Sequence, residues 1–118
     1  MTQTNNNCIF CKIIRGEIPA VKIWEDEKFI AMLDINPINP GHTLIIPKKH
    51  YEDIYAIPNN DLINIFNVAK IIAEKYRNIF NIKAINLISS NGFEGILNMG
   101  INFYVILFAM SYKNKKNN

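Results

Sequence analysis

The strongest constraint on the fold is one long amphipathic segment that runs from Asp61 to Phe80. Its apolar residues recur at intervals of three and four, which is the spacing of one face of an α-helix. They are Leu62, Ile65, Phe66, Ala69, Ile72, Ala73, Tyr76, Ile79 and Phe80. Asn59, Asn60 and Asp61 stand at the start and are residue types that cap helix N-termini. The pattern predicts a long helix over 61–80 with side-chain caps available.

Short segments of β-type sequence lie on both sides of this helix. Val21 to Glu25 and Phe29 to Leu33 flank the acidic tetrapeptide Glu25 to Lys28, and this arrangement predicts a hairpin. A further strand is expected at His42 to Pro47, which is rich in β-branched residues. Another is expected at Ala84 to Ser90, before an Asn-Gly turn.

Three other segments complete the chain. Cys8 to Arg15 has helical spacing and is followed by Gly16, so we expect a short helix there. Asp34 to Gly41 holds two Pro and one Gly and must be an irregular loop. From Gly95 to Tyr112 there is no charged residue, and the basic sequence KNKKNN follows.

Composition and charge restrict the class of protein. The chain has 118 residues, 49% hydrophobic and 19% charged, with five Gly and five Pro, so we expect one globular domain. Its net charge is +3, and three of its Lys (Lys113, Lys115 and Lys116) lie in the last six residues. The body is therefore nearly neutral, and we expect no nucleic-acid partner.

The start of the chain and its cysteines indicate a cytoplasmic protein. Residues 1–7 have no basic start and no apolar run, so we expect no signal peptide and a disordered N-terminus. In a reducing compartment, Cys8 and Cys11 are metal ligands, redox partners or buried small residues rather than a structural bridge. Two thiolates at this spacing can bind one Zn²⁺, which needs two more ligands.

Two other residues, Asp34 and His42, are candidates for a functional role. Asp34 follows a strand end and could bind vicinal hydroxyls, or it could cap its own turn. His42 could act as a base or an orienting residue, but no nucleophile is evident beside it. The chain has no Gly-rich phosphate loop, HExxH or GxSxG motif.

Five ordered sequence blocks together resemble the histidine-triad (HIT) family, in its Hint-like branch. The blocks are Cys8-Ile-Phe-Cys11, Gly16-Glu-Ile-Pro19-Ala, Trp24-Glu-Asp-Glu, Ala31-Met-Leu-Asp34-Ile-Asn-Pro37 and Pro40-Gly-His42-Thr-Leu-Ile-Ile-Pro47-Lys-Lys-His50. The resemblance runs from Cys8 to about Gly92. It implies an α+β, HIT-like fold: an antiparallel sheet of about five strands with one short and one long helix.

The resemblance also implies an activity and a site. Members of this family form homodimers, bind purine nucleotides and hydrolyse a bond at the α-phosphate, as in nucleoside phosphoramidates, without a cofactor for the chemistry. By similarity, the nucleotide-binding residues would be Ile9, Phe10, Ile18 and Met32, with Ile35 and Leu44 beside them, Asp34 on the ribose hydroxyls, and Ser90 where the family commonly has Asn. His42 would support the catalytic histidines, and Cys8, Cys11 and His50 match three zinc ligands.

The family pattern breaks in the C-terminal segment. The family's last strand reads His-x-His-x-His, and one of these imidazoles attacks phosphorus. This chain has no His after His50, and Ile101 to Leu107 stands at the expected distance without Ser, Cys or Lys. The expected Gly-Gln pair and the fourth zinc ligand, a His of that same segment, are also absent. We therefore expect nucleotide binding, with hydrolysis absent or very weak.

Three explanations of this break remain open. A base deletion near codons 93–100 would shift the frame, and it predicts His-x-His-x-His in another frame of the same gene. Alternatively, the chain is a divergent non-catalytic binding module, with Phe103 to Met110 as an edge or interface strand. Thirdly, Gly95 to Tyr112 is long enough for a membrane anchor, although Asn98 and Asn102 disfavour a span. For the chain as written we expect one HIT-like domain over 8–110, with an altered last strand from about residue 93, and a polar basic tail over 111–118.

Overall fold

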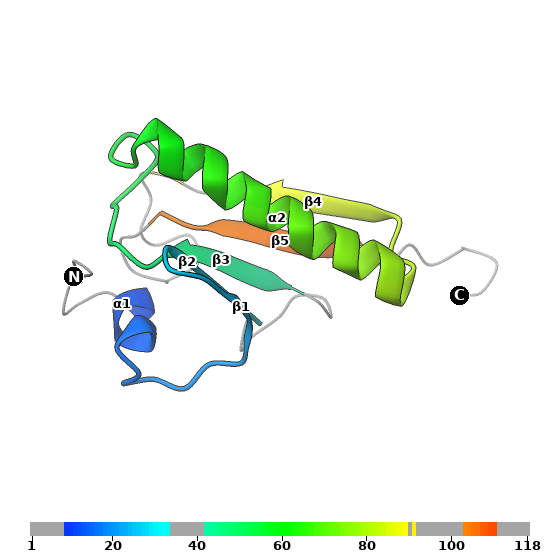
Figure 1. Cartoon of the computed structure of the whole chain (residues 1–118), viewed down its shortest axis with the longest axis horizontal. Coiled ribbons are helices and arrows are strands. Elements are labelled where there is room, and N and C mark those ends of the chain that lie inside the picture. The colour runs from blue at the N-terminus through cyan, green and yellow to red at the C-terminus, as the bar shows by residue number, and fades with distance from the viewer. Residues whose placement is uncertain (1–8, 34–41, 90, 92–102, 111–118) are drawn as a thin grey trace.

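A computed structural model describes residues 9–33, 42–89, 91 and 103–110 of the chain (Figure 1). Within these residues, a short helix, a long helix and five strands follow one another along the chain. They are α1 (Ile9–Ile14), β1 (Lys22–Glu25), β2 (Phe29–Leu33), β3 (Thr43–Pro47), α2 (Asn59–Phe80), β4 (Ala84–Ile88) and β5 (Val105–Met110). The expected α+β fold, with one short and one long helix, is confirmed.

The strands form one antiparallel sheet in the order β1-β2-β3-β5-β4. The last strand of the chain, β5, lies between β3 and β4: Ile106 is opposite Leu44 of β3, and Leu107 is opposite Leu87 of β4. The edge position that the second explanation allowed for this segment is therefore wrong, while the interface role that it also allowed stays a prediction. An uncharged, apolar run suits an inner position, where neighbouring strands pair with it on both sides.

The apolar run that could have formed a membrane anchor reaches into this strand. Residues 105–110 of that run are hydrogen-bonded into the sheet as β5, so they do not form a helix. Among the residues that the structure describes, no helix combines the length and apolar character needed to cross a membrane. Residues 95–102 and 111–112 of the run lie outside the described residues, together with both termini.

The two faces of the sheet carry separate apolar clusters, because side chains alternate along each strand. The face toward α2 holds Phe29, Ala31, Ile45, Val105 and Leu107, packed with the buried residues of the helix. The opposite face holds Ile30, Met32, Leu44, Ile46, Tyr104 and Ile106, packed with Cys11 and Ile13 of α1. We call these the α2 face and the α1 face; Figure 1 shows the two helices on opposite sides of the sheet.

The acidic tetrapeptide forms the turn of the β1–β2 hairpin, as its sequence predicts. Asp26 Oδ1 accepts hydrogen bonds from the backbone N–H groups of Lys28 (2.8 Å) and Phe29 (2.7 Å). The backbone N–H of Asp26 donates to the carbonyl oxygen of Phe29 at 3.0 Å. One carboxylate oxygen therefore satisfies two donors of the turn and holds the start of β2 in place.

The start of α2 differs from the expectation of a side-chain cap. The helix begins at Asn59, its N-cap is Pro58, and no side chain makes a capping hydrogen bond. Leu62 N–H donates to the carbonyl oxygen of Pro58 at 2.9 Å. The Asp61 carboxylate lies inside the first turn and accepts the Tyr51 hydroxyl at 2.7 Å, so it serves a tertiary contact instead of the cap. Negative charge in that turn still complements the helix dipole.

Candidate functional site

Three of the residues expected around the nucleotide base come together on the α1 face. Met32 and Leu44 lie opposite each other on β2 and β3, and both are buried. Ile18, from the segment after α1, packs against the same cluster. These side chains come from three separate parts of the chain and pack into one apolar cluster, of which Ile18 is the partly exposed member. An apolar environment of this kind is what a purine ring favours over water.

Of the other residues expected to contact the nucleotide, the structure describes only the backbone of two. Ile9 and Phe10 belong to α1, which packs on this face, but their side chains lie outside the described residues. Asp34, Ile35 and Ser90 lie outside them altogether. The ribose-binding role of Asp34 and the contacts of Ile35 and Ser90 therefore stay predictions.

His42 lies immediately before β3 and is 3% exposed. The next residue, Thr43, is fully buried, and its Oγ1 shares a hydrogen bond with the hydroxyl of Tyr76 on α2. This buried bond ties the beginning of β3 to the long helix. It thereby holds the start of β3 in place, where the buried imidazole of His42 would play the supporting role that the family resemblance implies.

The positions where the family carries its catalytic imidazoles are apolar or aromatic here, as far as the structure describes them. On the α1 face, Tyr104 and Ile106 lie beside Leu44, with 5% and 1% of their surface exposed. Within residues 103–107, whose side chains are described, no Ser, Cys, Lys or His is present. This part of β5 supplies packing to the site, and it carries none of the Ser, Cys, Lys or His side chains that commonly serve as nucleophiles.

Two of the three expected zinc ligands lie side by side. Cys11 Sγ is 3.2 Å from His50 Nδ1, and the cysteine is fully buried. Partial burial lowers the pKa of His50 below its ordinary value, and the charge of Glu52 opposes this shift. The third expected ligand, Cys8, lies outside the described residues. Within the described part of the chain, no three His, Cys, Asp or Glu side chains gather into a metal-binding group.

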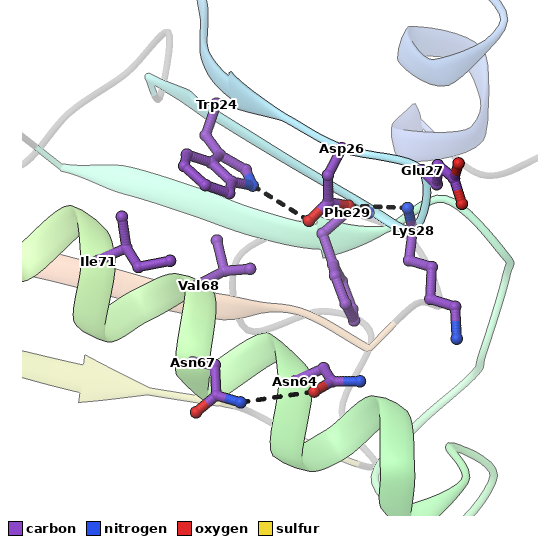
Figure 2. A pocket seen from close by; sticks show the side chains of 9 residues that line it. All are labelled: Trp24, Asp26, Glu27, Lys28, Phe29, Asn64, Asn67, Val68 and Ile71. Atoms are coloured by element: carbon purple, nitrogen blue, oxygen red, sulfur yellow. Dashed lines mark hydrogen bonds between the residues drawn. The ribbon is translucent and has the colours of Figure 1, made fainter.

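The structure also shows a groove on the α2 face of the sheet, which the sequence did not predict. It has a volume of about 420 Å³ and lies between the β1–β2 hairpin and α2 (Figure 2). Its lining comprises Trp24, Asp26, Glu27, Lys28, Phe29, Asn64, Asn67, Val68 and Ile71. The i, i+3, i+4 and i+7 spacing of the four helical residues marks one helix face in the sequence, but nothing there shows that the hairpin lies opposite that face.

A five-stranded antiparallel sheet with a long helix on one face, and a short helix over a buried apolar cluster on the other, defines an α+β domain of histidine-triad type. The sequence model of the HIT domain family matches residues 15–99. The chain belongs to the HIT domain family.

Several named proteins resemble the chain in sequence. An uncharacterized HIT-like protein of Methanocaldococcus jannaschii is 47% identical over 85 residues, which are 72% of this chain and 65% of that protein. The adenylylsulfatase of Arabidopsis thaliana is 38% identical over 74% of this chain and 44% of its own length. The adenosine 5'-monophosphoramidase of Candida albicans is 39% identical over 80% of this chain and 59% of its own length. The chain thus spans less than two thirds of the length of these relatives.

Solved structures resemble the chain over nearly its whole length. A HIT family protein from Bacillus anthracis superposes with a TM-score of 0.79 at 38% identity, covering 97% of this chain and 86% of that one. A zinc-bound histidine triad family protein from Mycobacterium smegmatis superposes with a TM-score of 0.82 at 30% identity, covering 92% of this chain and 78% of that one.

Proposed function

We propose that this chain binds a purine nucleotide or a nucleoside phosphoramidate on the α1 face of its sheet. The observation that carries the proposal is the convergence of Ile18, Met32 and Leu44 in one apolar cluster beside α1. Two relatives support the ligand class, since their names describe an adenylylsulfatase and an adenosine 5'-monophosphoramidase. The HIT domain of this chain supports the same class of ligand, because the two relatives resemble it over that domain.

In this site the apolar cluster would hold the base, with Ile9 and Phe10 of α1 completing the slot. Asp34, at the end of β2, would accept hydrogen bonds from the ribose hydroxyls. His42 would orient the ligand from the start of β3. We expect hydrolysis to be absent or very weak, because residues 103–107 carry no histidine to attack phosphorus by the route that the family resemblance implies.

Binding is tested by thermal unfolding with AMP. A ligand that binds only the folded state must stabilise it, by about 2.7 kcal/mol at one hundred times its dissociation constant. We expect AMP at millimolar concentration to raise the Tm by several degrees, and Asp34→Ala to reduce this shift. Asp53→Asn, in an exposed turn after β3, should leave it unchanged. No shift with AMP at millimolar concentration would overturn the proposal.

The absence of turnover is tested separately with an adenosine phosphoramidate. We expect the purified chain to release ammonia no faster than a buffer control, while AMP still raises its Tm. Hydrolysis at rates comparable with those of triad-bearing family members would contradict the non-catalytic part of the proposal and leave nucleotide binding intact.

We also propose a structural zinc ion held by Cys8, Cys11 and His50. In a tetrahedral site with Zn–S and Zn–N bonds of ordinary length, sulfur and nitrogen ligands are about 3.5 Å apart. The 3.2 Å between Cys11 Sγ and His50 Nδ1 is close to this separation, so the two donors fit one edge of such a site. The zinc-bound relative supports this metal. A reducing cytoplasmic location, which we also propose, would keep both thiols available as ligands.

Zinc is tested by metal analysis of the purified chain. We expect about one zinc per chain and its loss in Cys11→Ser, with a lower Tm in both this variant and the chelator-treated protein. A metal-free chain whose Tm is unchanged by added Zn²⁺ would overturn this part of the proposal.

A second copy of the chain is the macromolecular partner that we propose. The uncharged strand β4 ends the described sheet, and Leu87 and Ile88 on it are exposed. A homodimer formed along β4 would cover Leu87 and Ile88 and would give this strand a hydrogen-bonded neighbour on its open side.

A further inference from the structure

We propose that the groove between the β1–β2 hairpin and α2 binds an extended peptide segment that carries a Lys or Arg side chain (Figure 2). This groove lies on the α2 face, whereas the residues proposed for the nucleotide lie on the α1 face. The sheet separates the two, so a peptide here is a second ligand. Its binding does not depend on whether the nucleotide proposal holds.

The groove has apolar walls from two elements. Figure 2 shows Trp24 and Phe29 approaching from the hairpin, with Val68 and Ile71 facing them from the helix. Phe29 and Val68 are buried, while Trp24 and Ile71 are partly exposed. A volume of about 420 Å³ is in the range of small-ligand sites and accommodates one long side chain with its neighbouring main chain.

A fixed carboxylate stands beside the indole of this groove. Asp26 Oδ1 is held by the backbone N–H groups of Lys28 and Phe29. The other oxygen, Oδ2, accepts the Trp24 Nε1–H at 3.4 Å, a long bond that leaves room for a stronger donor. An ammonium or guanidinium placed over the indole and beside Asp26 would gain both a cation–π contact and a charge-assisted hydrogen bond.

The charge balance of the lining favours a cation. Asp26 and Glu27 are acidic, and Lys28 is the basic residue of the lining. The Lys28 ammonium lies 3.6 Å from the carboxylate of Asp61, outside the lining, which offsets its charge. The groove therefore presents net negative charge to a ligand, and an anion would be disfavoured.

Two carboxamides on α2 add the ability to recognise main chain. Asn64 and Asn67 lie one helical turn apart, and Asn67 Nδ2 donates to Asn64 Oδ1 at 3.4 Å. Each carboxamide carries both donors and an acceptor, which matches the N–H and C=O groups of an extended peptide. A bound peptide could replace the long hydrogen bond between Asn64 and Asn67 with two hydrogen bonds to its own main chain. The groove should therefore prefer peptides to simple amines.

The experiment uses Trp24 as its own reporter, because it is the single tryptophan of the chain. The full chain is titrated with acetyl-Ala-Ala-Lys-Ala-Ala-amide and with the same peptide carrying norleucine in place of Lys. We expect a saturable change in tryptophan fluorescence with the Lys peptide and about tenfold weaker binding of the norleucine peptide. Saturating AMP should leave the affinity for the Lys peptide unchanged.

Two pairs of variants identify the recognising groups. Asp26→Asn keeps an oxygen for the turn but removes the charge, and it should weaken the Lys peptide about tenfold. Its control is Asp53→Asn, since Asp53 Oδ1 also accepts two backbone N–H groups, both at 3.0 Å, away from the groove. Asn67→Ala should weaken both peptides, whereas Asn78→Ala, on the exposed surface of α2, should weaken neither.

Several results would overturn the proposal. One is the lack of any saturable fluorescence change up to millimolar Lys peptide, with the fold intact by circular dichroism. Another is equal affinity for the Lys and norleucine peptides, which would exclude recognition of the cation. A third is n-butylamine binding as tightly as the Lys peptide, which would exclude recognition of the main chain by the carboxamides.

Discussion

Tyr51 connects the loop after β3 with the first turn of α2. Its ring is 9% exposed, its hydroxyl donates to Asp61 Oδ2 at 2.7 Å, and its carbonyl oxygen accepts the Phe103 N–H at 2.6 Å. Burial, the hydrogen bond to Asp61 and the charge of Asp61 together raise the pKa of Tyr51 to about 12. A tyrosinate here would be desolvated and would face a carboxylate.

This raised pKa predicts a loss of stability at high pH. In the unfolded chain the Tyr51 hydroxyl ionises near its ordinary pKa of 10.0, so folding favours the protonated form. The stabilisation is fully present below pH 10 and is lost as the pH rises through about 12, with a magnitude of about 2 to 3 kcal/mol. The free energy of unfolding in urea, measured from pH 8 to pH 11.5, should fall accordingly.

Tyr51→Phe removes this ionisation, so its unfolding free energy should fall less steeply over the same interval. Tyr55→Phe is the matched control, because Tyr55 is 91% exposed, and its pH dependence should equal that of the original chain. If the unfolding free energies of Tyr51→Phe and of the original chain depend on pH in the same way, then ionisation of the Tyr51 hydroxyl does not affect folding stability.

Single residues also show what sequence reasoning could reach. The family resemblance named Met32 and Leu44 as contacts of the base, and the register of β2 against β3 places the two residues opposite each other. The partner of Asp61 could not be predicted, because Tyr51 precedes it by ten positions and a loop intervenes. The groove at Trp24 was missed for the same reason: its two walls are distant in sequence.

At the scale of elements, the sequence predicts which segments form strands but not which strands lie next to each other in the sheet. Each helix and strand lies within two or three residues of its expected position, because apolar periodicity and turn residues mark them locally. The order β1-β2-β3-β5-β4 depends on contacts between distant segments. For that reason the uncharged C-terminal run could be expected to form a strand, but its place between β3 and β4 could not.

The inner position of β5 predicts a large cost when its packing is removed. Leu107 is fully buried, lies opposite both Thr43 and Leu87, and packs under α2. Leu107→Ala should lower the free energy of unfolding by about 2 to 5 kcal/mol, because it removes buried methyl groups and leaves a cavity. This is a large part of the 5 to 15 kcal/mol that typically stabilises a domain. Chemical denaturation measures it.

Leu87→Ala on β4 is the matched control for that experiment. Its side chain is 42% exposed, so the same truncation should cost less than about 1 kcal/mol. Equal, small losses in both variants would mean that β5 is not packed between β3 and β4 in solution.

At the scale of the whole molecule, the two ends of the described sheet differ in chemistry. β1 carries Lys22 and Glu25, and charged side chains on an edge strand discourage pairing with another chain. β4 reads AINLI, carries no charge, and exposes Leu87 and Ile88. An unprotected edge of this kind favours association, so the proposed homodimer should form along β4 and leave β1 free.

Two substitutions of equal exposure separate these edges. Leu87, on β4, is 42% exposed, and Ile23, on β1, is 40% exposed. Leu87→Lys should convert the dimer to a monomer in sedimentation equilibrium, because a twofold axis would bring the two introduced ammonium groups close together against an apolar surface. Ile23→Lys should leave the dimer intact. If the original chain is a monomer at all concentrations, or if Ile23→Lys alone dissociates the dimer, then β4 is not the interface, and its exposed apolar side chains require another explanation.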